Sequence, residues 1–520
     1  MTNVNLKEPK EHLKISSKIK TIEQLTTISE QLRSENKRIV YCHGVFDLLH
    51  IGHVRHFGQA KKMGDILIVT ITPDQFVNKG PHRPAFTDRY RAEVIAALEC
   101  VDYVAINQWT TAAPTIKLLR PHFYVKGEDY KNAAKDYTGG IILEEEAVKS
   151  IQGKIVFTKD ITFSSSSLIN KHLPSFPDEV TAYLADFSTR FNSSEVIGHL
   201  ENAGNSNVLV VGEAIIDEYQ FCEAIGKSSK EPMLAVKNAS MEKYVGGILA
   251  VANHIASFVR EVRLITFLGE QKSEEHFIRE HLNPKVKPVF LYRKNSPTIV
   301  KRRLIESYFF TKMMELYELN DGLLEPDDNA SLCAMLKQYL PQYDLTIAVD
   351  FGHSLFTKEA IKTICEESKF LSVNVQTNAG NIGYQSIVKY PRADYVCLTE
   401  NEIRMEARDR RGNLKEIIEQ MARTFDYKRV TITRGKHGCI CYSKQDGFVE
   451  VPAFAGRVLD RMGAGDAFLA ITALCAVQET PPEVTGFIGN CAGALSVGTI
   501  GHSSFIDKVP LYKHIESLLK

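Results

Sequence analysis

Residues 38–69 read RIVYCHGVFDLLHIGHVRHFGQAKKMGDILIV, and the order of residue types predicts a strand, a tight turn and a helix. The apolar run that opens the segment ends at Gly44, and helical spacing of apolar residues begins near Gly52. This pattern places His50 and His53 at the start of the helix. Unpaired backbone N–H groups and the helix dipole attract anions there, and Gly52 lets a phosphate approach the backbone.

Two imidazoles beside such a pocket can donate hydrogen bonds to charge that develops on a phosphate during displacement. The segment therefore predicts nucleotidyl transfer, with His50 and His53 as the catalytic pair. A lone histidine near a helix start is more often a polar surface residue, and H-x-G-H also arises by chance. The context favours catalysis, because the string from Gly44 through Phe46-Asp47 to Gly64-Asp65 resembles the cytidylyltransferase-like nucleotidyltransferases.

The composition favours a globular protein of more than one domain. The 520 residues are too many for one core, and 44% hydrophobic and 24% charged residues are ordinary values. The 63 basic and 63 acidic residues cancel, which gives no sign of a nucleic-acid or membrane surface. We therefore expect small-molecule partners, with no nucleic acid and no membrane.

The cysteines and the N-terminus predict a cytoplasmic protein. Ten cysteines are scattered without metal or disulfide spacing, and Cys439 and Cys441 alternate like neighbours on one strand. The first residues are polar and lysine-rich, without the apolar region of a secretion signal. No segment approaches the about 18 apolar residues of a membrane span.

A first domain is predicted at residues 37–173, after a lead-in with one amphipathic helix at residues 1–36. Alternating strand and helix patterns indicate a parallel, doubly wound, Rossmann-like α/β sheet. Open sheets of this kind bind ligands at the carboxyl ends of their strands. Lys79 and Arg83 lie in such a loop and Lys126 follows another strand, although a single loop charge is more often merely solvated.

The resemblance supplies the remaining nucleotide contacts. Related enzymes carry Lys-Gly and Arg-Pro in the loop after the second strand, and a Ser-Thr-Thr sequence caps a helix that faces the phosphates. Serines before an apolar helical run are also ordinary helix caps. The nucleotide-binding residues implied are Gly44, Phe46, Asp47, Lys79, Arg83, Lys126, Ser165 and Ser166.

This first domain resembles the transferase half of the bifunctional heptose 7-phosphate kinase/heptose 1-phosphate adenylyltransferase family of lipopolysaccharide biosynthesis. The resemblance implies that a sugar 1-phosphate oxygen attacks the α-phosphate of a nucleoside triphosphate and that pyrophosphate leaves. It also implies Mg²⁺, which would bridge the phosphates and neutralise developing charge.

A second domain is predicted at residues 207–520, after a polar linker at residues 174–206. Near its end, Gly463-Ala464-Gly465 permits a tight turn whose N–H groups converge, and a helix opens from Asp466. Such an anion cradle beside a carboxylate suits phosphoryl transfer, with Asp466 taking a proton from a substrate hydroxyl. An Asp in a first helical turn is also a common partner of the helix dipole.

The string G-A-G-D-A-F resembles the second signature of the ribokinase (PfkB) sugar-kinase family, and other pieces follow in the family's order. Asp217 matches a residue that holds sugar hydroxyls, and Gly246-Gly247 precedes a helix as in the first signature. Residues 298–306 resemble the kinase segment that carries a Thr-x-Lys-x-Arg pattern. The resemblance implies nucleotide or phosphate binding by Thr433, Gly435, Gly463, Ala464, Gly465 and Asn490, and sugar binding by Asp217, Gly246 and Gly247.

Four residues depart from the family's pattern. Glu213 replaces the usual Asp after Gly212, and Ala250 stands where Asn is usual. Arg404 replaces the Glu of an Asn-x-x-Glu element that helps to organise magnesium, and Arg461 replaces a small Thr. A guanidinium can bind phosphate directly, but these changes are also typical of a weakened kinase. No residue is assigned as a metal ligand.

The sequence thus predicts two doubly wound α/β domains, an H-x-G-H nucleotidyltransferase followed by a ribokinase-like kinase, the reverse of the order in the heptose enzymes. It predicts a bifunctional enzyme that makes an ADP-heptose-like product for surface polysaccharide, with Mg²⁺ and ATP. Two alternatives stay open. One is a CTP-dependent alditol phosphate cytidylyltransferase, and the other a transferase with a catalytically weak, sugar-binding or dimerising kinase-like domain. A homodimer is expected by analogy.

Overall fold

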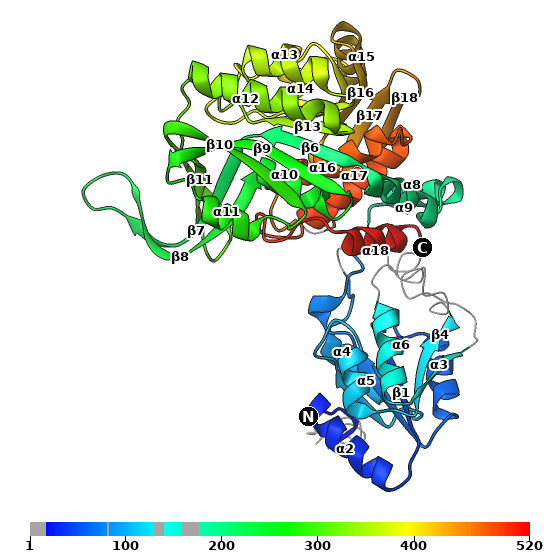
Figure 1. Cartoon of the computed structure of the whole chain (residues 1–520). Helices are drawn as coiled ribbons and strands as arrows, with labels where there is room; N and C mark the ends of the chain where they lie inside the picture. The colour runs from blue at the N-terminus through cyan, green and yellow to red at the C-terminus, as the bar shows by residue number, and fades with distance from the viewer. Residues whose placement is uncertain (1–16, 81–82, 129–139, 159–175, 457) are drawn as a thin grey trace, which may run out of the picture. The chain divides into compact units, whose positions relative to one another are not determined.

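The structure is a computed structural model, and it describes residues 17–80, 83–128, 140–158, 176–456 and 458–520. The chain divides into two compact units (Figure 1). The first unit comprises Met1–Pro177 with Tyr512–Lys520, and the second comprises Asp178–Leu511. Each unit is described below by itself.

The first unit contains a five-stranded parallel sheet in the order β3-β2-β1-β4-β5. The chain enters at the central strand, winds to one edge and then crosses back to β4 on the other side of β1. Ligands bind at such a reversal, outside the carboxyl ends of the strands. The strands are β1 (Ile39–Gly44), β2 (Ile66–Ile71), β3 (Tyr103–Ile106), β4 (Phe123–Gly127) and β5 (Lys154–Thr158).

Helices cover both faces of this sheet, which confirms the doubly wound α/β prediction. Val40 and Cys42 of β1 pack in one apolar cluster with α3 and α4, whereas Ile39 and Tyr41 pack in another with α2, α5 and α6. A strand buried on both faces reads as a continuous apolar run, as this one does. The helices are α2 (Ile22–Ser34), α3 (Ile51–Lys61), α4 (Asp88–Ala96), α5 (Ala113–Leu119) and α6 (Gly140–Ser150), with the 3₁₀ turn η1 (Asp74–Phe76).

The second unit contains a nine-stranded sheet in the order β10-β9-β6-β13-β14-β15-β16-β17-β18. The strands pair in parallel up to β16, and β17 and β18 add an antiparallel edge. Cys439 and Cys441 lie on β17, as the alternation predicted. The strands are β6 (Asn207–Gly212), β9 (Glu261–Gln271), β10 (Val286–Pro297), β13 (Leu345–Asp350), β14 (Leu371–Val375), β15 (Ala393–Thr399), β16 (Tyr427–Thr433), β17 (Cys439–Ser443) and β18 (Gly447–Val451).

Two layers of helices enclose this large sheet (Figure 1). Helices α12, α13, α14 and α15 pack in the apolar cluster of one face, and α10, α16 and α17 contact strands on the other side. The remaining helices of this unit are α8, α9 and α11, and α18 includes residues of both units. Their bounds are α8 (Asp178–Arg190), α9 (Ser193–Asn202), α10 (Ile248–Ala256), α11 (Glu275–His281), α12 (Pro326–Tyr339), α13 (Lys358–Glu367), α14 (Glu400–Glu406), α15 (Leu414–Thr424), α16 (Ala464–Val477), α17 (Pro482–Ser496) and α18 (Lys508–Leu518), and the 3₁₀ turns are η4 (Ala203–Asn205), η5 (Leu340–Gln342), η6 (Ile387–Lys389) and η7 (Gly435–His437).

A separate four-stranded sheet, the lid sheet, completes the second unit in the order β12-β11-β7-β8. Its strands are β7 (Ala214–Lys227), β8 (Leu234–Gly247), β11 (Ile299–Glu306) and β12 (Thr311–Glu318). The hairpin of β7 and β8 projects from the unit (Figure 1). Of the helices within the described residues, none is long and apolar enough to cross a membrane.

Candidate active sites

The histidine pair of the first unit lies at the start of α3, as predicted. His50 is the N-cap, and its Nδ1 accepts a hydrogen bond from Gly52 N at 3.2 Å. The ring of His53 stacks on that of His50, with 3.9 Å between centroids, and meets the ring of Phe46 edge-on at 5.2 Å. A Cβ at Gly44 would lie 2.9 Å from the Phe46 ring, so a glycine leaves room for the aromatic support of His53.

Both imidazoles are neutral at physiological pH. Burial, together with the neighbouring His50 and His56, lowers the pKa of His53 to about 3. Burial also lowers the pKa of His50. Because Nδ1 of His50 accepts from the Gly52 N–H, the ring proton of neutral His50 sits on Nε2. The pair can therefore donate hydrogen bonds to a phosphate without carrying full positive charge.

The loop after β2 is held by Asp47. This buried carboxylate accepts hydrogen bonds from Ala85 N at 2.7 Å and Phe86 N at 3.2 Å, and lies 3.4 Å from Nη1 of Arg83. The Asp47 carboxylate thus positions Arg83, and its predicted contact with the nucleotide stays a prediction. Burial lowers the pKa of Lys79, in the same loop, to about 8.

Lys126, at the end of β4, forms a buried ion pair. Its Nζ lies 3.0 Å from Oε2 of Glu144, which also accepts hydrogen bonds from Tyr124 OH at 2.8 Å and Ala112 N at 3.2 Å. Lys126 therefore has a structural partner, and its contact with a nucleotide stays a prediction. Ser165 and Ser166 lie outside the described residues.

Two further histidines near the pair were missed by the sequence reasoning. His43, at the end of β1, bonds Thr70 Oγ1 at 2.8 Å and Thr72 Oγ1 at 3.3 Å. His56 bonds Thr158 Oγ1 at 2.7 Å across the neighbouring strand. The three-residue spacing of His53 and His56 was a usable signal, because it places both on one face of a helix.

The second unit has a cavity of about 990 Å³ where the lid sheet meets the carboxyl ends of the central strands and the start of α16. Side chains from distant parts of the chain converge in it. Its lining includes Asp217, Gly247, Lys301, Arg303, Phe351, Gln376, Glu402, Arg404, Asp409, Thr433, Arg461, Gly463, Gly465, Asp466 and His502. Gly246, Gly435, Ala464 and Asn490, also predicted here, are not lining residues.

Asp466 lies in the first turn of α16, directly after the glycine turn. Gly463 is the N-cap with φ +76°, a left-handed conformation that a glycine adopts without strain. The Asp466 carboxylate is buried, and its Oδ1 accepts a hydrogen bond from Gln376 Nε2 at 2.6 Å. Burial raises the pKa of Asp466 to about 7. A carboxylate of this kind is suited to accept a proton near neutral pH.

Asp217, on β7, lies between the guanidinium of Arg303 and the imidazole of His502. Arg303 Nη1 bonds Oδ1 of Asp217, and His502 Nε2 lies 3.6 Å from Oδ2. A Cβ at Gly246 would lie 2.0 Å from Oδ2, so the glycine makes room for this carboxylate. Gly246 therefore supports the predicted sugar site through Asp217. His502 was missed because it follows α17, far along the chain.

Lys301 is buried in the same wall of the cavity. It lies next to Asp217 in the register of β11 and β7, and its Nζ sits 5.2 Å from the ring centroid of Tyr317 and 5.7 Å from that of Phe351. No carboxylate of the described residues lies within 4 Å of Nζ. Burial lowers the pKa of Lys301, as expected of an ammonium without a close counter-ion.

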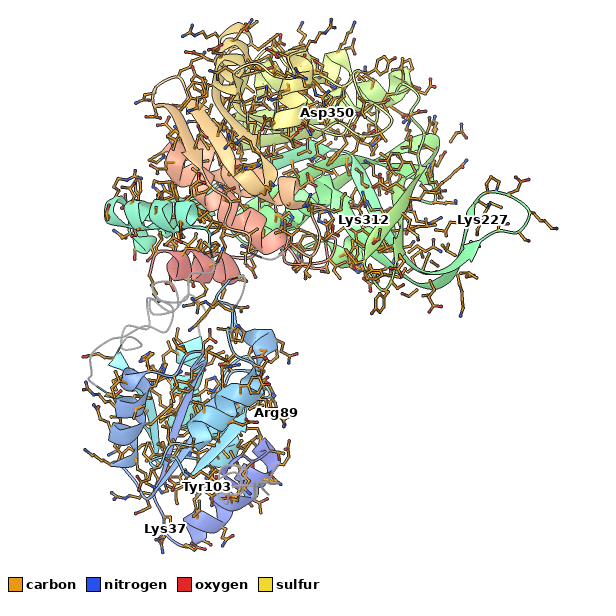
Figure 2. All side chains as sticks on the ribbon, turned by 180° about the vertical axis from the view of Figure 1, so that it is seen from behind. Lys37, Arg89, Tyr103, Lys227, Lys312 and Asp350 are labelled. Atoms are coloured by element: carbon orange, nitrogen blue, oxygen red, sulfur yellow. The ribbon has the colours of Figure 1, made fainter. Side chains whose placement is uncertain are left out.

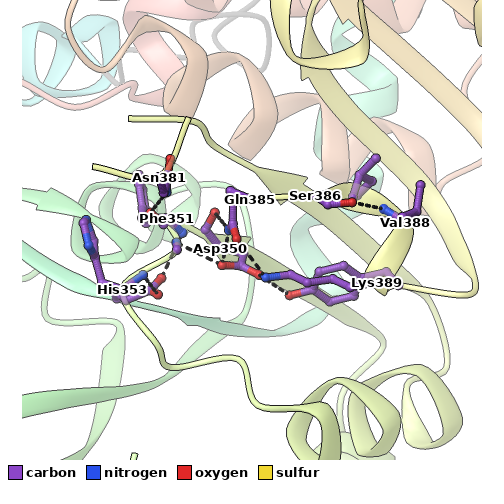
Figure 3. A network of polar contacts seen from close by, with 12 residues as sticks. Asp350, Phe351, His353, Asn381, Gln385, Ser386, Val388 and Lys389 are labelled. Atoms are coloured by element: carbon purple, nitrogen blue, oxygen red, sulfur yellow. Dashed lines mark hydrogen bonds and ion pairs between the residues drawn. The ribbon is translucent and has the colours of Figure 1, made fainter. Parts of the chain in front are cut away.

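A polar network holds the loop after β13, which carries Phe351 (Figure 3). Glu213 accepts hydrogen bonds from Phe351 N and His353 N, each at 3.0 Å. Asp350 bonds Lys389 Nζ at 2.6 Å and Gln385 Nε2 at 2.5 Å. Burial and the nearby Asp350 raise the pKa of Glu213. The longer side chain that departs from the family pattern thus anchors this loop.

The remaining predicted site residues, and the residues that differ from the family pattern, lie both inside and outside the cavity. Thr433 lines the cavity, whereas Asn490 Nδ2 donates to Val451 O at 3.1 Å and Pro452 O at 2.9 Å. Ala250 is buried in α10. Arg404 bonds Glu400 at 2.8 Å and Gly412 O at 2.9 Å, so its guanidinium is occupied, whereas Arg461 is exposed at the cavity.

The carboxylates of the second unit's cavity suit a metal ion that binds together with the nucleotide phosphates better than a metal ion held by the protein alone. Among the residues that the structure describes, no group of three His, Cys, Asp or Glu side chains could hold a metal. Glu402 and Asp409 reach the cavity of the second unit, but Glu402 accepts a hydrogen bond from Thr377 N at 3.0 Å and Asp409 accepts one from Gly412 N at 2.7 Å. Magnesium usually binds one or two carboxylates together with substrate phosphates and water.

Comparison with known families confirms both resemblances. The pfkB family carbohydrate kinase model matches residues 205–508, and the Cytidylyltransferase-like model matches residues 41–172. Because the first match covers more than half of the chain, the protein belongs to the pfkB family of carbohydrate kinases, and it carries a cytidylyltransferase-like domain ahead of the kinase domain.

The curated relatives match the N-terminal part. "Bifunctional protein HldE" of Aliarcobacter butzleri is 41% identical over 142 residues, which is 27% of this chain and 29% of that protein. The Geobacter metallireducens protein of the same name is 34% identical over 175 residues, 32% of this chain and 34% of that protein. The chain thus spans about a third of the length of these relatives. The order of the two domains is reversed relative to HldE.

Solved structures of sugar kinases cover about three fifths of this chain. Phosphofructokinase-2 from Escherichia coli in complex with potassium is 14% identical, with a TM-score of 0.49, over 61% of this chain and 100% of that one. Arabidopsis thaliana ribokinase complexed with ribose and ATP is 18% identical, with a TM-score of 0.45, over 61% of this chain and 99% of that one.

Proposed function

We propose that the protein is a bifunctional enzyme of nucleotide-activated sugar synthesis. The second unit phosphorylates a sugar, and the first unit couples a sugar 1-phosphate to a nucleotide. One observation carries the proposal. Asp466, a buried carboxylate with its pKa raised to about 7, stands at a glycine turn in the same cavity as Asp217. Phosphoryl transfer to a hydroxyl requires a proton acceptor, a turn that binds the phosphate and a polar site that holds the sugar, and this cavity brings the three together.

In the kinase step, Asp217 orients the acceptor and Asp466 takes the proton of the attacking hydroxyl. The N–H groups of the turn from Gly463 to Gly465 hold the transferring γ-phosphoryl group of ATP. Arg461, at the mouth of the cavity, supplies positive charge to the donor phosphates. Mg²⁺, bound with the nucleotide, neutralises phosphate charge.

The acceptor proposed for the kinase is a sugar phosphate of the heptose 7-phosphate kind. Lys301 supports this proposal, because its buried ammonium lines the cavity without a carboxylate within 4 Å among the described residues. Burying an unpaired charge is costly, and an anionic substituent on the sugar would compensate it. Arg303 is already paired with Asp217 and Glu315, so Lys301 is the more available cation.

In the transferase step, an oxygen of the sugar 1-phosphate attacks the α-phosphate of ATP, and pyrophosphate leaves. His50 and His53 donate hydrogen bonds to the charge that builds up on that phosphate, beside the N-terminus of α3. Arg83 and Lys79 approach the phosphates from the loop after β2. The product proposed is an ADP-heptose-like sugar nucleotide for surface polysaccharide.

The departures keep a second candidate function in view. Arg404 occupies the family's Glu position and donates hydrogen bonds to Glu400 and to Gly412 O. This arrangement favours a weak kinase-like domain that binds a sugar and regulates the transferase. The retained Asp466 favours catalysis. On the transferase side, a CTP-dependent enzyme that acts on an alditol phosphate stays an alternative, because backbone groups often read the base.

We also propose a homodimer formed through the lid sheet, in the cytoplasm. Met241, Met314 and Leu316 lie 48–62% exposed on the face of the lid sheet opposite Asp217. A row of exposed apolar side chains suits a second copy across a two-fold axis. Replacing Met314 and Leu316 by Glu should yield a monomer by sedimentation. All ten cysteines are free thiols, which supports a reducing compartment.

The deciding experiment measures both reactions of the purified full chain. ADP formation is followed with ATP and heptose 7-phosphate. Pyrophosphate release is followed with ATP or CTP, supplied with heptose 1-phosphate, glycerol phosphate or ribitol phosphate, and with His53→Ala as control. Release with ATP and heptose 1-phosphate that is lost in His53→Ala supports the proposal. Release only with CTP and an alditol phosphate would replace it with the first alternative.

A further inference from the structure

Asp460, three residues before the glycine turn, joins the lid sheet to that turn. Its side chain is 1% exposed. Oδ2 accepts hydrogen bonds from Tyr219 OH at 2.6 Å and Gly501 N at 3.0 Å, and Oδ1 accepts from Met462 N at 3.1 Å. Oδ1 also pairs with the ammonium of Lys312. Four donors therefore meet on one buried carboxylate.

The donors come from different parts of the second unit. Tyr219 belongs to β7 and Lys312 to β12, both strands of the lid sheet, whereas Met462 adjoins the glycine turn. Lys312 also lies 5.4 Å from the ring centroid of Tyr219. Figure 2 shows Lys312 toward the body of the unit and Lys227 on the projecting hairpin. The lid sheet is thus tied to the glycine turn through Tyr219 and Lys312.

We propose that Lys312 is a positioning residue of the kinase: its ammonium, bound to Asp460, sets the lid sheet against the glycine turn. This inference rests on the proposed kinase function. The lid sheet carries Asp217 and Lys301, which hold the acceptor, and the turn leads to Asp466, which accepts the proton. Lys312 does not line the cavity, so it acts through Asp460 rather than on substrate.

Physical magnitudes make this pair more than an ordinary surface ion pair. An exposed pair contributes little to stability, whereas a buried carboxylate that loses its cation keeps an uncompensated charge. Asp460 is buried, so loss of the ammonium moves the turn, the lid sheet or both. A displacement of about 1 Å between reacting groups costs about 10²-fold in rate.

The test removes the ammonium and then returns it. In Lys312→Ala, kcat for phosphoryl transfer should fall about 10- to 100-fold, with KM for ATP and sugar within about threefold. Because the Lys312 side chain is 31% exposed, solvent reaches the vacated position, and methylammonium should restore part of kcat. Lys312→Arg keeps the charge and should lose less than Lys312→Ala.

A matched control contacts the other end of the same strand. Lys272 pairs with Glu318 at the end of β12, but its side chain is 70% exposed. Lys272→Ala removes a lid-sheet ion pair without uncovering a buried charge, so kcat should stay within about twofold. Equal losses in the two variants, a loss confined to KM, or no rescue by methylammonium would each overturn the proposal.

Hydrogen exchange separates failure of this inference from failure of the proposed function. In Lys312→Ala, backbone amides of residues 458–466 and of β7 should exchange faster together, and those of the first unit should not change. This readout needs no turnover. Absence of kinase activity in the wild-type protein would refute the proposed function. The exchange result would then still show whether the Lys312–Asp460 pair holds the turn. Unchanged exchange at residues 458–466 would refute the pair.

Discussion

The two candidate sites differ in how the chain assembles them. In the first unit, Gly44, Phe46, His50 and His53 lie in one strand–turn–helix segment, so local order brings them together. In the second unit, the residues around Asp466 come from the lid sheet, from the loop after β14 and from the loop after α17. A site built from one continuous segment can therefore be recognised in the sequence. Of a site built from distant segments, the sequence shows only the part that is a local motif, here the glycine turn with Asp466.

The sites also differ in their electrostatics. Burial lowers the pKa of His53 to about 3 and raises the pKa of Asp466 to about 7. The same desolvation disfavours the charged form in both cases, but it removes a cation in one site and an anion in the other. In the proposed mechanisms, the transferase site uses neutral donors, and the kinase site uses a group whose pKa lies near neutral pH.

The largest effect that can break this comparison is expected from Asp466→Asn. A general base contributes about 10²- to 10⁴-fold, so kinase turnover should fall by that amount while pyrophosphate release stays unchanged. The two activities are measured separately on the same preparation. Asp327→Asn, at an exposed position of α12, is the control. Unchanged kinase turnover in Asp466→Asn would contradict the assignment of Asp466 as the base.

The reciprocal change is His53→Ala. Loss of one oxyanion-type donor costs about 10²- to 10³-fold, so pyrophosphate release should fall by that factor and kinase turnover should not change. His53→Gln retains an N–H donor and should recover part of the rate. Val54→Ala, at the next position of α3, controls for damage to the helix. A transferase that tolerates His53→Ala contradicts the assignment.

The pH dependence sharpens the electrostatic contrast. Protonated Asp466 cannot accept a proton, so kcat/KM of the kinase should rise about tenfold per pH unit up to about pH 7 and then level off. The transferase should show no limb from His53 between pH 6 and 8, because that pKa is lowered to about 3. A histidine-dependent limb near pH 6.5 in the transferase, absent in His53→Ala, would count against the neutral pair.

Asp466 also predicts a stability change of defined sign. Its raised pKa means that the folded state holds the proton more tightly than the unfolded state. The stability that it contributes is full below about pH 4 and is lost as the pH rises through about 7. The Tm advantage of Asp466→Asn over the wild type should therefore grow between pH 5 and 8. A constant difference in thermal denaturation would contradict the raised pKa.

The smallest effect is expected from Gly246→Ala. The added Cβ would lie 2.0 Å from Asp217 Oδ2, so the carboxylate must move. We expect KM for the sugar to rise about tenfold, the equivalent of about 1.4 kcal/mol, with KM for ATP unchanged. Gly198→Ala, where an added Cβ meets no atom within 4 Å, is the control. An equal rise of KM for the sugar and of KM for ATP would contradict a role of Gly246 in sugar binding.

Much of the first site was predictable, because its interactions are local. The strand ending at Gly44 and the helix start at His50 follow from apolar spacing and were confirmed. The use of Asp47 to hold Arg83, and of Glu144 to pair with Lys126, was not predicted. The partners of those carboxylates lie on loops and helices far away in the sequence, so the spacing of residue types does not predict such contacts.

For the second site, the glycine turn and Asp466 followed from four adjacent residues. The sequence matched residues 298–306 to a family segment but did not single out Lys301 or Arg303, since their value depends on the parallel register that sets Lys301 beside Asp217. His502 gave no signal of its own. Lys312 reads in the sequence as one more lysine, and only its contact with buried Asp460 distinguishes it.

Sequence alone established two doubly wound α/β domains, an anion-binding helix start at His50 and a glycine turn before Asp466. These features depend on backbone order and on residues close together in the chain, where the dihedral preferences and spacing are already decided. The tertiary structure decided which charges are buried and what they face. Desolvation and ion pairing depend on segments that meet only after folding, so the pKa of Asp466, the available ammonium of Lys301 and the Lys312–Asp460 pair come from the fold.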